Sequence, residues 1–299
     1  MTLLIALVLG VVQGVFMFVP VSSTSHLVLV QTALRDRGME LPAPDSPELI
    51  LFDLVVHVGT LVSVVLVMGD GIRELVQGVR EDRLLGRLRP GGAFSEAVAS
   101  RLVLLMLLSV AVTGALGLGF QGPLTRVFGS PALVAGALVL TGAMLWWTDA
   151  MTPERSGQRL RFGWRGPAQV TVTVAVLVGA AQAAALAPGI SRSGTTIFAA
   201  LLLGMQRTLA ARYSFYVAIP TIIAATGVQT LQVAVGDGFG TISWGAMAVG
   251  FVAAAGVGTA ALWLVLRLLE SARFRVFSLY VWVLAGVVLV SGVGVGHTG

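Results

Sequence analysis

Two clusters of hydroxyl side chains follow prolines inside otherwise apolar stretches of the sequence, after Pro20 and after Pro188. A break in a helix exposes the N-terminus of the next helix, whose free N–H groups and positive dipole end favour an anion. Hydroxyls, amides and a guanidinium are the donors that phosphate oxygens bind. The clusters therefore predict an oxyanion site, with these candidates: Ser22, Ser23, Thr24 and His26 in the first, and Gly189, Ser191, Arg192, Ser193 and Thr196 in the second.

Arg192 is the strongest single signal, because an arginine at the centre of a transmembrane helix costs on the order of 3 kcal/mol on insertion scales. No acidic residue lies near it in the sequence. A bound oxyanion would offset this cost. The alternative is a structural ion pair with a distant carboxylate, Asp53 or Asp149.

His26 follows Ser22 by four residues and Ser23 by three, on the expected first turn of the returning helix. An imidazole can accept a proton from a hydroxyl and deliver it to a leaving oxygen near neutral pH, which makes His26 a candidate catalytic base. The alternative is a buried histidine of the core. Asp53 and His57 lie four residues apart and share one face of a predicted helix, as supporting residues.

The composition places the chain in a membrane. Of its 299 residues, 56% are hydrophobic and only 11% are charged, whereas a soluble domain has about 25% charged residues. Cysteine is absent, which excludes disulfides and thiolate metal sites, and all 19 basic residues are arginine, which excludes lysine chemistry. These arginines are dispersed between apolar runs, so the sequence predicts no nucleic-acid partner.

Six apolar stretches are long enough to span a bilayer, which needs about 20 apolar residues per helix. They lie near 48–68, 102–119, 131–148, 213–233, 243–266 and 276–296. Two further stretches, 2–34 and 168–206, are interrupted by the hydroxyl clusters. The fold class predicted is an all-α polytopic membrane protein with six transmembrane helices and two re-entrant helical hairpins.

The arginines predict the orientation of these segments under the positive-inside rule. The arginine-rich connections 69–101 and 149–167 should be cytoplasmic, the second with Arg155, Arg159, Arg161 and Arg165. The connections 31–47 and 234–242 should face outward, with acids such as Asp45 and Asp237. Each interrupted stretch then begins and ends on one side, the first outside and the second inside, and both termini are extracytoplasmic.

The two interrupted stretches also resemble each other. Gly10-x-x-Gln13 ends nine residues before Ser22, and Gly179-x-x-Gln182 ends nine before Ser191. Similar hairpins that enter from opposite faces are typical of an inverted-topology repeat, whose binding site lies near the midplane. We expect one domain over 1–299, with repeats at about 1–119 and 168–266. Gln13 and Gln182 should bond the backbone of the opposing hairpin. The alternative is ordinary Gly/Pro kinks in spanning helices.

At these two stretches the chain resembles the undecaprenyl-diphosphate phosphatase family, the bacitracin-resistance membrane proteins. The family motif Pro-Gly-x-Ser-Arg-Ser-x-x-Thr is matched in full by residues 188–196. The first family motif is matched at Gly10, Gln13, Gly14, Phe18, Pro20, Ser22, Ser23 and His26. The resemblance covers nearly the whole chain and implies the same fold of six spans and two hairpins, in a bacterial inner membrane.

One departure from the family pattern is Met17, which stands where the second glutamate of its acidic motif belongs. The resemblance implies a divalent cation, Mg²⁺ or Ca²⁺, near that carboxylate. A thioether neither binds such a hard ion nor activates a nucleophile. We therefore expect activity that is reduced or absent relative to the family.

The resemblance implies dephosphorylation of a polyprenyl diphosphate to the monophosphate carrier lipid of cell-wall synthesis. In this interpretation Ser23 attacks the terminal phosphorus, His26 is base and then acid, and Arg192 stabilises the transferred phosphoryl group. The alternative is a non-catalytic transporter, flippase or binder of polyprenyl phosphate, since broken helices at the midplane are also transporter architecture. An ion channel would not require the hydroxyl-rich anion site.

Overall fold

The computed structural model describes residues 1–43, 46–88, 96–120, 130–150, 165–235, 242–270 and 274–291. This part of the chain is helical and contains no strand beyond one isolated bridge between Arg165 and Met205. The helices are α1 (Leu3–Phe18), α2 (Ser23–Asp36), α3 (Pro47–Leu84), α4 (Val98–Gly119), α6 (Pro131–Ala150), α7 (Val172–Ala184), α8 (Arg192–Leu202), α9 (Arg207–Val235), α10 (Trp244–Glu270) and α11 (Arg275–Ser291). The prediction of an all-α protein is confirmed.

Five helices, α3, α4, α6, α9 and α10, are long and apolar enough to cross a membrane. They indicate a multi-pass membrane protein and match five of the six predicted spans. The sixth, at 276–296, corresponds to α11, which is apolar but has only 17 residues. Residues 292–296, with Arg155, Arg159, Arg161, Asp45 and Asp237 of the predicted connections, lie outside the described residues.

Helix α3 is much longer than the predicted span, because it continues to Leu84 rather than ending near residue 68. The apolar run ends there, but half of the residues from 69 to 84 are good helix formers, namely Arg, Glu, Leu and Gln. Near its end, the buried Asp82 accepts hydrogen bonds from the backbone N–H of Ser100 (3.0 Å) and from Nη1 of Arg87 (3.2 Å). These contacts hold the end of α3 against the start of α4.

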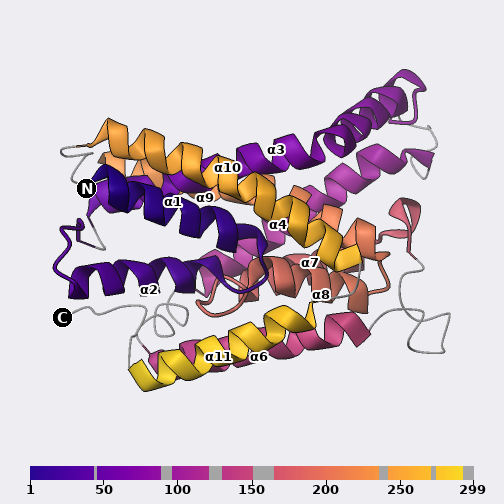
Figure 1. Ribbon diagram of the computed structural model, residues 1–299. Coiled ribbons are helices and arrows are strands. Elements are labelled where there is room, and N and C mark those ends of the chain that lie inside the picture. Colours follow the sequence, from indigo (N-terminus) through magenta and orange to yellow (C-terminus); the bar gives the residue numbers. More distant parts are fainter. Residues whose placement is uncertain are drawn as a thin grey trace.

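Each interrupted stretch forms two short helices joined by a turn, α1 with α2 and α7 with α8 (Figure 1). Thr2 and Thr171 cap the first helix of each pair by accepting a backbone N–H in the first turn. Pro20 and Pro188 lie in the turns, where no helical N–H is needed. Each pair packs against itself as well as against other helices.

The packing of the helices is reciprocal between the two halves of the chain. Helix α1 packs mainly on α10, α7 packs mainly on α4, and α6 packs on α11. Glycines permit the close approach: a Cβ at Gly10 would lie 2.6 Å from the carbonyl oxygen of Gly250 on α10. A Cβ at Gly179 would lie 2.5 Å from that of Ser109 on α4. Small residues at such contacts are typical of helix packing in membranes.

The two turns meet in the interior of the helix bundle. In Figure 1, α3 and α10 lie on one side and α6 and α11 on the opposite side, with the two broken segments between them. The backbone N–H of Gly189 donates to Oγ of Ser22 (3.2 Å), and Oγ of Ser193 donates to the carbonyl of Phe18 (3.4 Å). These contacts bring the two hydroxyl clusters together. Ser22 and Gly189 are 167 residues apart along the chain, and Phe18 and Ser193 are 175 residues apart.

Candidate active site

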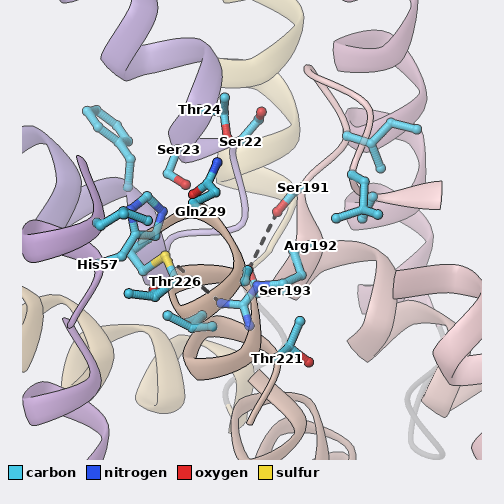
Figure 2. Close-up of a pocket in the computed structure, with 18 residues that line it drawn as sticks. Ser22, Ser23, Thr24, His57, Ser191, Arg192, Ser193, Thr221, Thr226 and Gln229 are labelled. Carbon is cyan, nitrogen blue, oxygen red and sulfur yellow. Dashed lines mark hydrogen bonds between the residues drawn. The ribbon is translucent and has the colours of Figure 1, made fainter. Parts of the chain in front are cut away.

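A cavity of about 230 Å³ lies where the two turns meet. Its walls come from both broken segments and from α3 and α9, and Figure 2 shows its polar side chains around one space. The polar lining residues are Ser22, Ser23, Thr24, His57, Ser191, Arg192, Ser193, Thr221, Thr226 and Gln229. Apolar side chains, among them Leu54, Ile190 and Ile222, complete the wall. Such a cavity suits a ligand with a polar head and an apolar chain.

The N-terminus of α2 faces this cavity without a side-chain cap. Its N-cap residue, Ser22, has a left-handed backbone (φ 68°), rare for a residue other than glycine, and its side chain accepts no hydrogen bond from a backbone N–H of the helix. The Ser22 hydroxyl instead contacts Oγ of Ser25 (3.1 Å) and accepts from Gly189. The first amides of α2 are therefore left for a ligand, beside the hydroxyls of Ser23 and Thr24.

The turn before α8 is held by a residue that the sequence analysis did not single out. Thr141 of α6 donates to the carbonyl of Gly189 (2.9 Å) and accepts from the N–H of Ser191 (3.1 Å). Gly189 has φ 91°, and a Cβ there would lie 2.6 Å from the carbonyl oxygen of Val134. Ser191 caps α8 by accepting from the N–H of Gly194 (3.2 Å). This framework positions Arg192 as the first residue of α8.

Arg192 lines the cavity and has no carboxylate within 4.0 Å in the part of the chain that the structure describes. Its Nη2 lies 4.0 Å from Sδ of Met17, which also lines the cavity. The alternative of an ion pair with Asp53 or Asp149 is not seen. Asp149 instead accepts from the backbone N–H of Arg275 (2.8 Å). The guanidinium therefore faces a cavity in which a bound oxyanion would balance its positive charge.

The two histidines near the site differ in position. His57 is in the cavity lining, with its Nδ1 2.6 Å from the carbonyl of Asp53. His26, the predicted base, is not among the lining residues. Its Nδ1 lies 2.7 Å from the carbonyl of Ser22 and its Nε2 lies 2.7 Å from the hydroxyl of Tyr280. The structure brings Ser23, His57 and Arg192 to one cavity. His26 lies outside the cavity lining, bonded to Ser22 and Tyr280.

The remaining predicted residues support the site from a distance. Among the residues that the structure describes, neither glutamine makes the expected bond to the opposing hairpin: Gln13 donates to Sδ of Met17 (3.5 Å) within its own helix. Gln182 donates to the hydroxyls of Thr113 (3.1 Å) and Thr221 (3.0 Å). The Oγ1 of Thr196 lies 2.6 Å from Oγ of Ser214 on α9, and Thr196 does not line the cavity.

Asp53 is also outside the lining, and its Oδ1 is buried without a hydrogen-bond partner among the described residues. The polar residues of α9 that line the cavity were missed in the sequence analysis. Thr226 and Gln229 are three residues apart in an apolar helix, so they form a short polar face that could have been noticed. Thr141 and Tyr280 gave no such signal, because each is a single polar residue in an apolar span.

Comparisons with known proteins agree on one family. The family model described as bacitracin resistance protein BacA matches residues 6–287. A protein of Halorhodospira halophila named undecaprenyl-diphosphatase is 46% identical over 289 residues, which cover 97% of each chain. Proteins of the same name from Alkalilimnicola ehrlichii and Desulfatibacillum aliphaticivorans are 47% and 38% identical, and each match covers at least 95% of both chains. The chain therefore belongs to the bacitracin resistance protein BacA family.

Proposed function

We propose that this protein hydrolyses undecaprenyl diphosphate to undecaprenyl phosphate and inorganic phosphate. The observation that carries this proposal is the shared cavity in which Ser23, at the uncapped N-terminus of α2, meets Arg192, at the start of α8. The relatives' name, undecaprenyl-diphosphatase, supports the same substrate. Apolar residues of α3 and α9 in the wall suit the first isoprene units of the lipid.

In this reaction Oγ of Ser23 attacks the terminal phosphorus, and the bond from that phosphorus to the bridging oxygen breaks. The leaving group is undecaprenyl phosphate, and the phosphoryl group passes to the serine. Arg192 and the amides of α2 stabilise the charge on the equatorial oxygens. Water then hydrolyses the phosphoserine and releases phosphate, which restores the Ser23 hydroxyl.

A resident divalent cation does not fit the donors around this cavity. Mg²⁺ and Ca²⁺ are held mainly by carboxylates, with carbonyl oxygens beside them, but the lining has no carboxylate: it offers the carboxamide of Gln229, a thioether, an imidazole, hydroxyls and a guanidinium. Within the described residues, no group of three His, Asp or Glu side chains is close enough to hold a metal. The guanidinium of Arg192 would also repel a cation. The reaction above therefore uses no metal ion held by the protein.

The arrangement of the helices supports an inverted-topology repeat with re-entrant hairpins. The pairings α1 with α10, α7 with α4, and α6 with α11 are those expected when a two-fold operation exchanges the halves of the chain. This pairing adds α6 and α11 to the repeats expected from the sequence.

The arginine distribution supports an inner-membrane orientation with both termini outside the cytoplasm, and the start of α1 and the end of α11 lie at the same end in Figure 1.

The test is phosphate release from undecaprenyl diphosphate by the purified protein in detergent, with and without EDTA. We expect turnover by the wild type and its loss in Ser23→Ala. A gel-filtration profile and unfolding temperature like those of the wild type show that the variant is folded. A wild type that binds the lipid and releases no phosphate would instead support the transporter or lipid-phosphate binder.

A further inference from the structure

His26 and His57 make the same local hydrogen bond. In each, Nδ1 lies within 2.7 Å of the backbone carbonyl four residues earlier, that of Ser22 for His26 and that of Asp53 for His57. A carbonyl oxygen only accepts, so Nδ1 carries the proton in both neutral rings. The lone pair that could accept a proton in catalysis is therefore on Nε2 in both histidines.

The two Nε2 atoms differ in their partners. In His26, Nε2 lies 2.7 Å from the hydroxyl of Tyr280 on α11, and the tautomer requires that the phenol donates this bond. The His26 ring also stacks on Phe16, with centroids 3.7 Å apart and planes within 17°. Phe16 is itself a lining residue of the cavity, whereas His26 is not. His26 is thus engaged at both nitrogens and covered on one ring face.

In His57, by contrast, Nε2 has no hydrogen-bond partner in the described part of the chain, and the side chain lines the cavity (Figure 2). Ser23 and Arg192 line the same cavity of about 230 Å³. The bond from Nδ1 to Asp53 fixes both the tautomer and the ring orientation. An oriented imidazole with a free lone pair, in one cavity with a serine hydroxyl, is a set of groups that can activate a nucleophile.

We propose that His57 is the general base and acid of this cavity, and that His26 and Tyr280 are positioning residues. The assignment rests on the proposed phosphatase function. Nε2 of His57 takes the proton of the Ser23 hydroxyl, directly or through one water, as the bond from Oγ to phosphorus forms. It returns that proton to the departing undecaprenyl phosphate. In the second half, it takes a proton from the attacking water and returns it to Oγ of Ser23 as phosphate leaves.

His26 acts at a distance in this scheme. The chain of hydrogen bonds from Tyr280 through His26 to the carbonyl of Ser22 holds the one left-handed non-glycine residue in the described backbone. A strained residue persists only where its surroundings fix it. Loss of His26 would relax this turn and move Ser23 and the first amides of α2. The base would remain in place.

The pH profile separates the two roles, because it reports the group that titrates in catalysis. The charged or titratable residues that border His57 are Arg192 from α8 and Asp53 on its own helix; the lining residues of α1, α2 and α9 carry no titratable side chain. Arg192 stays charged across the neutral range. The carboxyl of Asp53 is outside the cavity lining, and Asp53→Asn tests its contribution to the profile. A titration near neutral pH that disappears in His57→Gln and survives in Asp53→Asn is therefore that of the imidazole.

The experiment measures kcat and KM for phosphate release from undecaprenyl diphosphate between pH 5 and 9, in the wild type, His57→Gln, His26→Gln and Tyr280→Phe. In His57→Gln we expect kcat to fall about 10²–10⁴-fold, the contribution of general acid–base catalysis, and the acidic limb of the profile to vanish. In His26→Gln and Tyr280→Phe we expect smaller losses with the acidic limb kept. The double variant of these two should lose little more than His26→Gln alone, since both act on one turn.

Absence of turnover in the wild type would overturn the proposed function, and this assignment with it. With wild-type turnover present, an acidic limb that survives in His57→Gln and disappears in His26→Gln would overturn the assignment alone. A faster Tyr280→Phe would do the same, because it would mean that the phenol blocks a catalytic Nε2. If His57→Gln fails to fold by its unfolding temperature, His57→Asn is measured in its place, with the same expected loss and the same contrary result.

Discussion

Sδ of Met17 lies 4.0 Å from Nη2 of Arg192, in the wall of the cavity between the two broken segments. The thioether brings no charge to this contact, so the guanidinium keeps its full charge for a ligand. A carboxylate at position 17 would lie within reach of the same guanidinium. The residue at this position therefore affects the charge at the anion site.

For this reason we expect Met17→Glu to raise KM for undecaprenyl diphosphate about tenfold, because the new carboxylate would compete for Arg192; one hydrogen bond to a charged group contributes about 1.5–3 kcal/mol. Met17→Leu, which keeps the volume and stays uncharged, should change KM little. Steady-state phosphate release measures both. A higher kcat in Met17→Glu at unchanged KM would contradict this expectation and favour the catalytic carboxylate indicated by the sequence.

Removal of the guanidinium itself should have a larger effect. We expect Arg192→Ala to reduce kcat/KM about 10²–10³-fold, the usual loss when a donor to a developing anion is removed. Arg192→Lys should restore only part of this activity, because an ammonium lacks the planar fork of donors. The matched control is Arg73→Ala, since Arg73 is exposed on α3 and, within the described part of the chain, forms an ion pair only with the exposed Asp70. Equal losses in Arg192→Ala and Arg73→Ala would contradict the role of Arg192.

Asp82, at the end of α3 beyond the apolar run, gives a prediction about stability and pH. Burial would raise the pKa of its carboxyl, but hydrogen bonds from Ser100 and Arg87 outweigh burial and hold this pKa below its ordinary value. The stabilisation from such a group is present above the ordinary aspartate pKa of about 3.9 and is lost as pH falls through the lowered value. Asp82→Ala should therefore lower Tm at pH 7, since it leaves the buried Ser100 N–H without a partner.

The difference in Tm between wild type and Asp82→Ala should shrink as pH falls below about 4, because the carboxyl of the unfolded chain is protonated there first and the folded carboxylate only at its lowered pKa. Circular dichroism during thermal unfolding in detergent measures this Tm difference at each pH. Glu96→Ala is the control, since among the described residues Glu96 makes only a long contact of 3.9 Å with Arg87 and is largely exposed. A Tm difference that is constant from pH 7 to pH 3 would contradict the account of Asp82.

Much of the fold follows from patterns that the sequence displays directly. Long apolar runs predict spanning helices because a bilayer requires them, and five of the six were found. The prolines and hydroxyls after Phe18 and Ala187 predict breaks because a helix interior accepts neither well. The end of α3 was not predictable in the same way. Loss of hydrophobicity marks where a membrane contact ends, and the helix itself continued for another four turns.

The site could be predicted only in part. Serines, arginine and glycines next to a helix break carry a local signal, and six residues of the two clusters, Ser22 to Thr24 and Ser191 to Ser193, do line the cavity. Which histidine faces that cavity depends on contacts between distant segments. The contact that distinguishes His26 from His57 is its hydrogen bond to Tyr280, which is 254 residues from His26 along the chain. No spacing in the sequence could have indicated it.

The reciprocal contact of Gly10 and Gly179 with the opposite half of the chain gives a final prediction about the fold. Gly179→Ala would place a Cβ 2.5 Å from the carbonyl oxygen of Ser109, so α7 and α4 must separate. Alanine otherwise favours a helix over glycine by about 0.5–1 kcal/mol. The control is Gly114→Ala on α4, where a Cβ meets nothing within 4 Å. We expect Gly179→Ala to lower Tm and phosphate release, and Gly114→Ala to keep activity with an equal or higher Tm; two variants with the same Tm would contradict the close contact.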